Sequence, residues 1–285
     1  MNTTAPGPGG GQWISGAVAV ASLRHRGGSP PCQDAVGASS AGRRYVAALD
    51  GRGSSAHSQL GSAAAAAALG RELTAVEPLL ARCLDELEPD TAQAQAFWGE
   101  ATATILRGLR DAQDVAANAN AVDSRELEFT VSLAVAGVRG IGLIQLGDGC
   151  VLLERATQMV TATNRQCGEY AGETNFLGPD EGSLLNAEAT LQSAAGVSAI
   201  IAFTDGVAAR WLHGLTLAPA PGIVRVIEHL RSGKWTEQDL AQHFDLPHWQ
   251  GVHDDDRSLA YLIAQVTGPG TEPSQTVGPG PVQAQ

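Results

Sequence analysis

Four aspartates lie where a short apolar segment runs into a turn, and three of the four are followed by glycine. They are Asp50 in YVAALDGRGS, Asp148 in GLIQLGDGCVLL, Asp205 in AIIAFTDGVA and Asp255 in HDDDRSLAYLI. A carboxylate at the end of a strand is held rigidly while its oxygens point out of the core. Mg²⁺ and Mn²⁺ prefer cages of such hard oxygen ligands. Because a single Asp-Gly is also a common hairpin turn, the recurrence of the pattern is what predicts a divalent metal site.

Converging carboxylates would support phosphoryl transfer. Without cations they repel one another. With two divalent ions about 3.5–4 Å apart they clamp a phosphoryl group, and a bridging water ionised near neutral pH attacks in line. This chemistry needs no nucleophilic side chain, and the chain has neither a GxSxG elbow nor a His-rich metal motif. The alternative is turn chemistry on a solvated rim, which is strongest for Asp148, because Gly-Asp-Gly suits a hairpin.

The elements that must position these aspartates are strands and long helices. Alternating and β-branched residues predict strands over 13–25 and 43–50, and Ala/Leu-rich stretches predict helices over 57–87 and 90–122. Residues 129–155 have the pattern of three strands joined by turns. Residues 196–212 follow as a strand, a turn and a helix. Two short helices are predicted over 223–233 and 236–245, the second with Thr236 and Asp239 placed as a capping box. The last strand is predicted over 257–266. Strand hairpins with helices bunched between them favour an α+β fold with antiparallel sheets.

Composition narrows the class of protein. The chain has 285 residues, a net charge of −12 and 44% hydrophobic residues. This acidity argues against nucleic acid or an anionic membrane as the partner, and no apolar run reaches the roughly 18–20 residues of a membrane helix. No signal peptide is indicated, and four cysteines without CxxC spacing are expected to be reduced thiols of a cytoplasmic protein. One folded domain over 12–267 is expected, between a flexible segment 1–11 and a disordered tail 268–285.

Six motifs occur in an order that resembles a known family. They are CQDA (32–35), VAALDGRGSS (46–55), LIQLGDG (143–149), GEYAGETNFL (168–177), AFTDGV (202–207) and DDRSLAYL (255–262). Their order and spacing resemble the metal-dependent serine/threonine phosphatases of type 2C, and in particular the compact bacterial branch. The resemblance implies a four-layer α/β/β/α sandwich of two antiparallel sheets flanked by helices, with the metals at one end.

The resemblance also implies roles for individual residues. Asp50 would bridge two Mg²⁺ or Mn²⁺ ions, and the backbone carbonyl of Gly51 would be a further ligand. Asp205 and Asp255 would be metal ligands, and Asp256 takes the slot next to Asp255 that is Asn in many relatives. Asp34 would hold metal-bound water, and Asp148 would help to bind a third ion in addition to the two. Asp50, Asp205 and Asp34 are the predicted catalytic residues, and Thr204 and Ser258 are expected to orient neighbouring aspartates.

Three positions depart from the better-known relatives. Gln33 replaces an acidic residue before Asp34, and Ser29 occupies the slot of an arginine that grips the substrate phosphate. Arg52 stands where eukaryotic relatives carry a histidine proposed as general acid. Arg52 and Arg26 are therefore the candidate phosphate contacts, since a guanidinium binds phosphate bidentately.

The predicted function is hydrolysis of phosphoserine and phosphothreonine in proteins, reversing a serine/threonine kinase, with a phosphoprotein as partner. Two alternatives stay open. One is a catalytically weak or inactive module of the same fold that binds a phosphoprotein or a kinase. The other is a hydrolase of small phosphate esters. Titration with a divalent metal separates the binding module from the enzymes.

Overall fold

The computed structural model describes residues 12–26, 31–166, 174–214, 217–249 and 254–265. The segments 1–11 and 268–285, predicted to be flexible and disordered, lie outside the described residues, as does Ser29.

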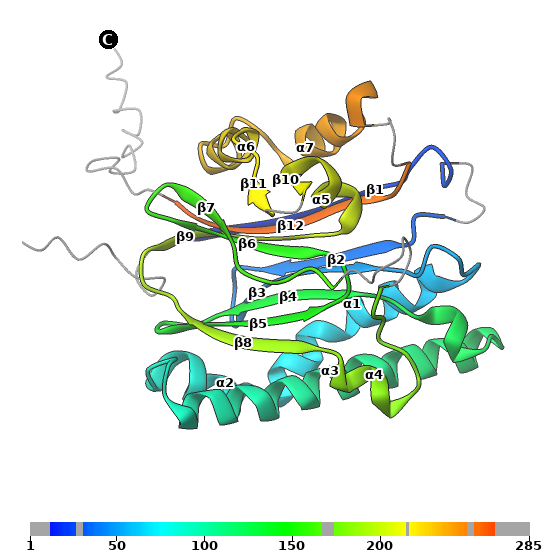
Figure 1. The fold of residues 1–285 in the computed structure, drawn as a ribbon, viewed down its shortest axis with the longest axis horizontal. Coiled ribbons are helices and arrows are strands. Elements are labelled where there is room, and N and C mark those ends of the chain that lie inside the picture. The colour runs from blue at the N-terminus through cyan, green and yellow to red at the C-terminus, as the bar shows by residue number, and fades with distance from the viewer. Residues whose placement is uncertain (1–11, 27–30, 167–173, 215–216, 250–253, 266–285) are drawn as a thin grey trace, which may run out of the picture.

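Two five-stranded antiparallel sheets form the centre of the molecule (Figure 1). The first sheet has the order β1 (Trp13–Val20), β12 (Arg257–Ala264), β9 (Val197–Phe203), β6 (Cys150–Arg155) and β7 (Gln158–Thr161). The second has the order β2 (Asp34–Ser39), β3 (Arg44–Asp50), β4 (Val131–Ala136), β5 (Gly140–Leu146) and β8 (Glu188–Ser193). A short pair, β10 (Leu212–His213) and β11 (Ala218–Pro219), lies beside the first sheet.

Helices cover the outer face of each sheet, so the predicted α/β/β/α sandwich is confirmed. Figure 1 shows one group of helices on either side of the paired sheets. The second sheet is covered by α1 (Ser58–Ala75), α2 (Glu77–Leu80), α3 (Ala92–Asn120), α4 (Glu181–Leu185), a π-helical turn (Ala81–Glu86) and a 3₁₀ turn (Ser124–Leu127). The first sheet is covered by α5 (Asp205–Trp211), α6 (Gly222–Arg231), α7 (Glu237–Phe244) and a 3₁₀ turn (Pro247–Trp249).

The buried apolar side chains form three clusters, one between the two sheets and one between each sheet and its helices. Alternation along the strands explains this arrangement. In β3, Val46 and Ala48 face the other sheet, whereas Ala47 and Leu49 face α1 and α3. Successive side chains of a strand point to opposite faces, so a strand apolar at every position is buried on both sides. Strands buried on both faces pack against the other sheet on one side and against helices on the other. The aspartates lie at the ends of these strands.

Most predicted elements are present, with two differences. The run 57–87 was predicted as helix throughout, but α1 ends at Ala75 and a new helix begins at Glu77, where Pro78 lies in the first turn. Proline lacks the backbone N–H that a continuous helix requires. The predicted capping box is confirmed, since Thr236 accepts from the N–H of Asp239 and Asp239 accepts from that of Thr236. The strands β2, β7, β8, β10 and β11 and the helix α4 were not predicted.

Candidate metal centre

Three aspartates from separate parts of the chain meet at one end of the sandwich. Asp50 ends β3, Asp205 begins α5 directly after β9, and Asp148 lies in the turn between β5 and β6. One carboxylate oxygen from each lies within 4.8 Å of the others. The prediction that these strand-end aspartates converge is confirmed for this triad.

Asp34 and Asp255 flank the triad. Asp34 begins β2 and is the cross-strand partner of Asp50. The hydroxyl of Thr204 donates a hydrogen bond to Oδ2 of Asp34 at 2.8 Å and accepts one from the N–H of Ser258. Asp255 lies two residues before β12, and its Oδ1 accepts from the N–H of Asp256 at 2.9 Å. Both flanking carboxylates therefore lie at or just before the first residue of a strand.

Burial and mutual repulsion raise the pKa values of these acids. Burial, followed by the charge of Asp256, raises the pKa of Asp34 to about 7. Burial raises the pKa of Asp50 well above its usual range, with Asp34, Asp205 and Asp255 adding to the effect. Burial, followed by the charges of Asp255 and Asp148, raises the pKa of Asp205 well above its usual range. The pKa of Asp255 is also raised, mainly by burial. Crowded buried carboxylates are unstable as anions unless cations offset them.

The donor set fits a hard divalent cation. All the converging atoms are carboxylate oxygens, which suit Mg²⁺ or Mn²⁺ and not the softer metals that select thiolates. Asp50, Asp148 and Asp205 would hold such an ion, with Asp34 and Asp255 beside them. The roles predicted for Asp34, Asp255 and the carbonyl of Gly51 as ligands stay predictions.

Two glycines allow the backbone to approach closely at this rim. A Cβ on Gly51 would lie 2.8 Å from the carbonyl oxygen of Gln33 and 2.8 Å from Oγ of Ser58. A Cβ on Gly206 would collide with the carbonyl oxygen of Asp256. Packing thus requires the glycine after Asp50 and the glycine after Asp205.

Asp256 organises the backbone on the other side of the centre. Its Oδ1 accepts the N–H of Ser22 at 2.7 Å, and its Oδ2 accepts the N–H of Gln33 at 2.7 Å. Oδ2 also lies 2.8 Å from Nδ1 of His25, a buried ring whose Nε2 has no partner among the described residues. Asp256 is only 1% exposed. It anchors both ends of the connection between β1 and β2, a role that sequence spacing did not indicate.

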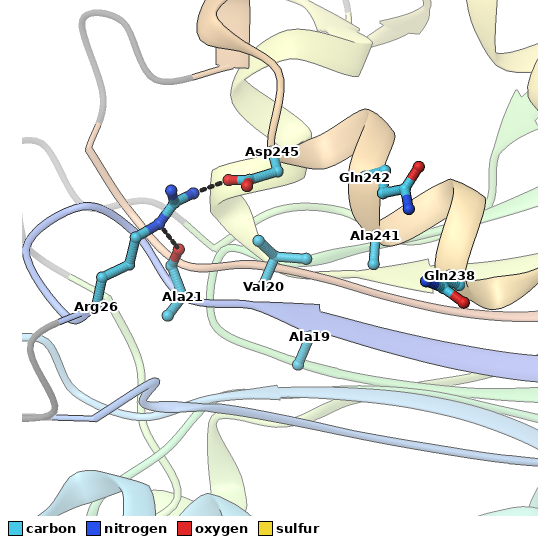
Figure 2. A pocket seen from close by; sticks show the side chains of 8 residues that line it. All are labelled: Ala19, Val20, Ala21, Arg26, Gln238, Ala241, Gln242 and Asp245. Carbon is cyan, nitrogen blue, oxygen red and sulfur yellow. Dashed lines mark hydrogen bonds and ion pairs between the residues drawn. The ribbon is translucent and has the colours of Figure 1, made fainter.

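The two arginines predicted as phosphate contacts have carboxylate partners. Arg52 pairs with Glu128 at 2.7 Å, and its guanidinium lies over the ring of Phe176. Arg26 pairs with Asp245 of α7 and lines an open pocket between β1 and α7 (Figure 2). Both charges are thus already balanced by neighbouring acids, and contact with a phosphate stays a prediction for each.

A third arginine, which sequence reasoning missed, lies at the acidic centre. Nε of Arg165 donates to the backbone carbonyl of Asp148 at 2.5 Å. Its positive charge also acts to lower the pKa of Asp205. Arg165 stands in a loop after β7 with no periodic or motif signal around it, so only the fold brings it here.

The cysteines in the described part of the chain are poorly suited to act as nucleophiles. Cys32, Cys83 and Cys150 are free thiols, while Cys167 lies outside the described residues. Burial raises the pKa of the Cys32 thiol, with Asp34 and Asp256 adding to the effect, and burial raises that of Cys150 to about 12. Thiols held protonated in this way are poor nucleophiles.

A comparison with protein-family models decides the family. The model described as protein phosphatase 2C matches residues 23–244. The chain belongs to the protein phosphatase 2C family. The resemblance drawn from the six motifs is confirmed, although residues 168–173 of the fourth motif lie outside the described part of the structure.

Solved structures of bacterial serine/threonine phosphatases share the fold at low sequence identity. The serine/threonine phosphatase PstP/Ppp of Mycobacterium tuberculosis is 15% identical, with a TM-score of 0.58 over 89% of this chain and 99% of that one. The catalytic domain of PstP in complex with two manganese ions is 15% identical, with a TM-score of 0.56 over 89% of this chain and 98% of that one. Stp1 from Staphylococcus aureus is 13% identical, with a TM-score of 0.56 over 88% and 94%. A search of curated proteins found no match.

Within the described part of the chain, no helix combines the length and the apolarity that crossing a bilayer requires.

Proposed function

We propose that this protein phosphatase 2C member is a metal-dependent phosphatase that hydrolyses phosphoserine and phosphothreonine in proteins. The observation that carries the proposal is the triad Asp50, Asp148 and Asp205, whose carboxylate oxygens lie within 4.8 Å of one another. Support also comes from the names of the structural relatives, which are serine/threonine phosphatases, one of them with two manganese ions. The substrate would then be a protein phosphorylated by a serine/threonine kinase.

The residues of the centre have complementary tasks. Asp50, Asp148 and Asp205 would hold Mg²⁺ or Mn²⁺, with Asp255 beside them. The bound cations would supply Lewis-acid activation of water and neutralise charge on the phosphoryl group. Asp34 would hold a water beside the cations; its pKa of about 7 belongs to the cation-free centre, and bound cations would favour its ionised form. The hydroxyl of Thr204 fixes Oδ2 of Asp34, and Asp50 faces Asp34 across the strand pair.

Hydrolysis of p-nitrophenyl phosphate and of a phosphothreonine peptide, with and without Mn²⁺, tests the proposal. Asp205→Asn is the informative variant, because it keeps the shape of the side chain and removes one charge of the triad. Asp111→Asn, at an exposed position of α3, is the matched control. We expect Mn²⁺-dependent release by the wild type and the control, and a loss of at least about 100-fold in Asp205→Asn, in line with the loss of one electrostatic contact to the transition state.

The same experiment addresses the alternatives. No release by folded wild-type protein at millimolar Mn²⁺ would contradict the phosphatase and favour the phosphoprotein-binding module. Release from p-nitrophenyl phosphate but not from the peptide would favour a hydrolase of small phosphate esters.

A further inference from the structure

One guanidinium lies against the acidic centre and is held there at a single atom. Nε of Arg165 is fixed by the carbonyl oxygen of Asp148, in the turn that carries one carboxylate of the triad. The side chain is partly buried. The hydrogen bond uses one edge of the planar guanidinium and leaves the edge with the two terminal NH₂ groups for another acceptor.

Those two terminal nitrogens have no partner in the described part of the chain. No carboxylate there lies within 4.0 Å of them, although the positive charge is near enough to act on Asp205. An arginine that served only as a counter-ion of the triad would be expected to pair directly with one of its carboxylates. Arg165 instead stands beside the triad with two donors uncommitted.

Hydrogen bonds hold the chain on either side of Arg165. The N–H of Val151 donates to Oγ1 of Thr163 at 3.0 Å, before Arg165 in the chain. After it, the N–H of Gln166 donates to the carbonyl of Gly147 at 2.9 Å, and Oε1 of Gln166 accepts the N–H of Gly147 at 3.1 Å. The segment is thus tied to β6 before Arg165 and to the Asp148 turn after it. A donor fork fixed in this way loses little freedom when it binds an anion.

The other arginines near the centre are less suited to the task. Arg52 and Arg26 are paired with Glu128 and Asp245. Arg24 acts on the pKa of Asp255, but its side chain is exposed and has no hydrogen bond to another described residue. Among the described arginines, Arg165 alone combines contact with the triad's own turn, partial burial and an uncommitted fork.

We propose that Arg165 is the phosphate-binding arginine of this enzyme, gripping two non-bridging oxygens of the substrate phosphate while the aspartate triad holds the cations. This inference rests on the proposed function. The arginine slot of the better-known relatives holds Ser29 here, and Arg165, in the loop after β7, would supply the guanidinium instead. Planar guanidinium and phosphate match in bidentate geometry, which an ammonium group does not reproduce.

Binding of inorganic phosphate to the Mg²⁺-saturated protein, measured by calorimetry, tests the assignment without turnover. The variants are Arg165→Gln and Arg165→Lys, with Arg107→Gln on the exposed face of α3 as the control. We expect the Kd for phosphate to rise about 10- to 100-fold in Arg165→Gln, the range for charge-assisted hydrogen bonds, and less in Arg165→Lys. The Kd for Mg²⁺ should stay within about threefold of wild type, and KM for the peptide should rise.

The outcomes that overturn the assignment are distinct. An unchanged Kd for phosphate in folded Arg165→Gln would exclude the contact. A rise in the Kd for Mg²⁺ that accounts for the weaker phosphate binding would make Arg165 a positioning residue of the Asp148 turn. If the wild type binds phosphate through Arg165 but hydrolyses nothing, the proposed function fails and the binding site stands.

Discussion

Asp34 and Asp50 face each other across the β2–β3 pair, the first residue of one strand opposite the last residue of the other. Two carboxylates in directly opposed cross-strand positions repel each other when both are ionised. Burial, followed by the charge of Asp34, raises the pKa of Asp50 well above its usual range. For Asp34, burial and then the charge of Asp256 raise the pKa to about 7, while a hydrogen bond with Asp50 acts to lower it. The fold therefore maintains an arrangement that is unfavourable without protons or cations, as expected of a site built to bind cations.

The stability of the metal-free protein should fall as the pH rises from about 4 to about 7. The folded-state pKa of Asp34 is raised from 3.8 to about 7, so over this window the native state binds more protons than the unfolded state. Stability decreases with pH wherever this holds. Asp34→Asn removes the titrating group and should flatten the profile. Thermal unfolding in EDTA at several pH values measures this, and parallel profiles of variant and wild type would contradict it.

Divalent metal should stabilise the protein through the triad. A ligand that binds only the native state raises Tm with its concentration. We expect Mn²⁺ to raise the Tm of wild type and of Asp111→Asn. In Asp148→Asn the Kd for Mn²⁺ should rise at least about tenfold, since even residues that only support metal ligands contribute about 10- to 100-fold. Equal Mn²⁺ titrations of Asp148→Asn and Asp111→Asn would remove Asp148 from the metal centre.

Sequence reasoning succeeded where the signal is local or repeated. The apolar segments before Asp50, Asp148 and Asp205 predicted strands ending in carboxylates, and the antiparallel sandwich brings all three to one rim. The capping box at Thr236 needs only residues three apart, so the sequence shows it directly.

What the sequence did not reveal depends on contacts between distant segments. Strand β2 is short and only partly buried, so periodicity did not identify it, and the pairing of Asp34 with Asp50 came only with the fold. Asp256 accepts bonds from residues more than 220 positions away. Arg165 reaches the centre through a loop whose composition carries no such signal.

Asp256 should matter more to folding than its neighbour Asp254. Asp256→Ala would leave the buried N–H groups of Ser22 and Gln33 without an acceptor, which costs about 1–3 kcal/mol each. Asp254 also accepts two N–H groups, those of Leu23 and Arg24, but it is only partly buried and these hydrogen bonds are exposed, so water can replace it. We expect Asp256→Ala to lower the free energy of unfolding by about 2–5 kcal/mol and Asp254→Ala by about 1 or less. Urea denaturation measures both, and similar losses would refute the anchoring role.

A methyl group at Gly206 should be poorly tolerated, because the backbone of Asp256 occupies the space that a Cβ would need. The contact is with a carbonyl oxygen, which cannot rotate away as a side chain could. Asp205 and the segment leading into β12 would have to separate, so Gly206→Ala should destabilise the fold by about 1–3 kcal/mol and weaken Mn²⁺ binding.

Gly99→Ala in α3 is the matched control, since a Cβ there meets no atom within 4 Å. That change should raise stability by up to about 1 kcal/mol, because alanine favours a helix over glycine, and leave Mn²⁺ affinity unchanged. Urea denaturation and Mn²⁺ titration of the two variants test the contrast, and a Gly206→Ala protein that matches Gly99→Ala in both would show that the Asp205 turn has room to move.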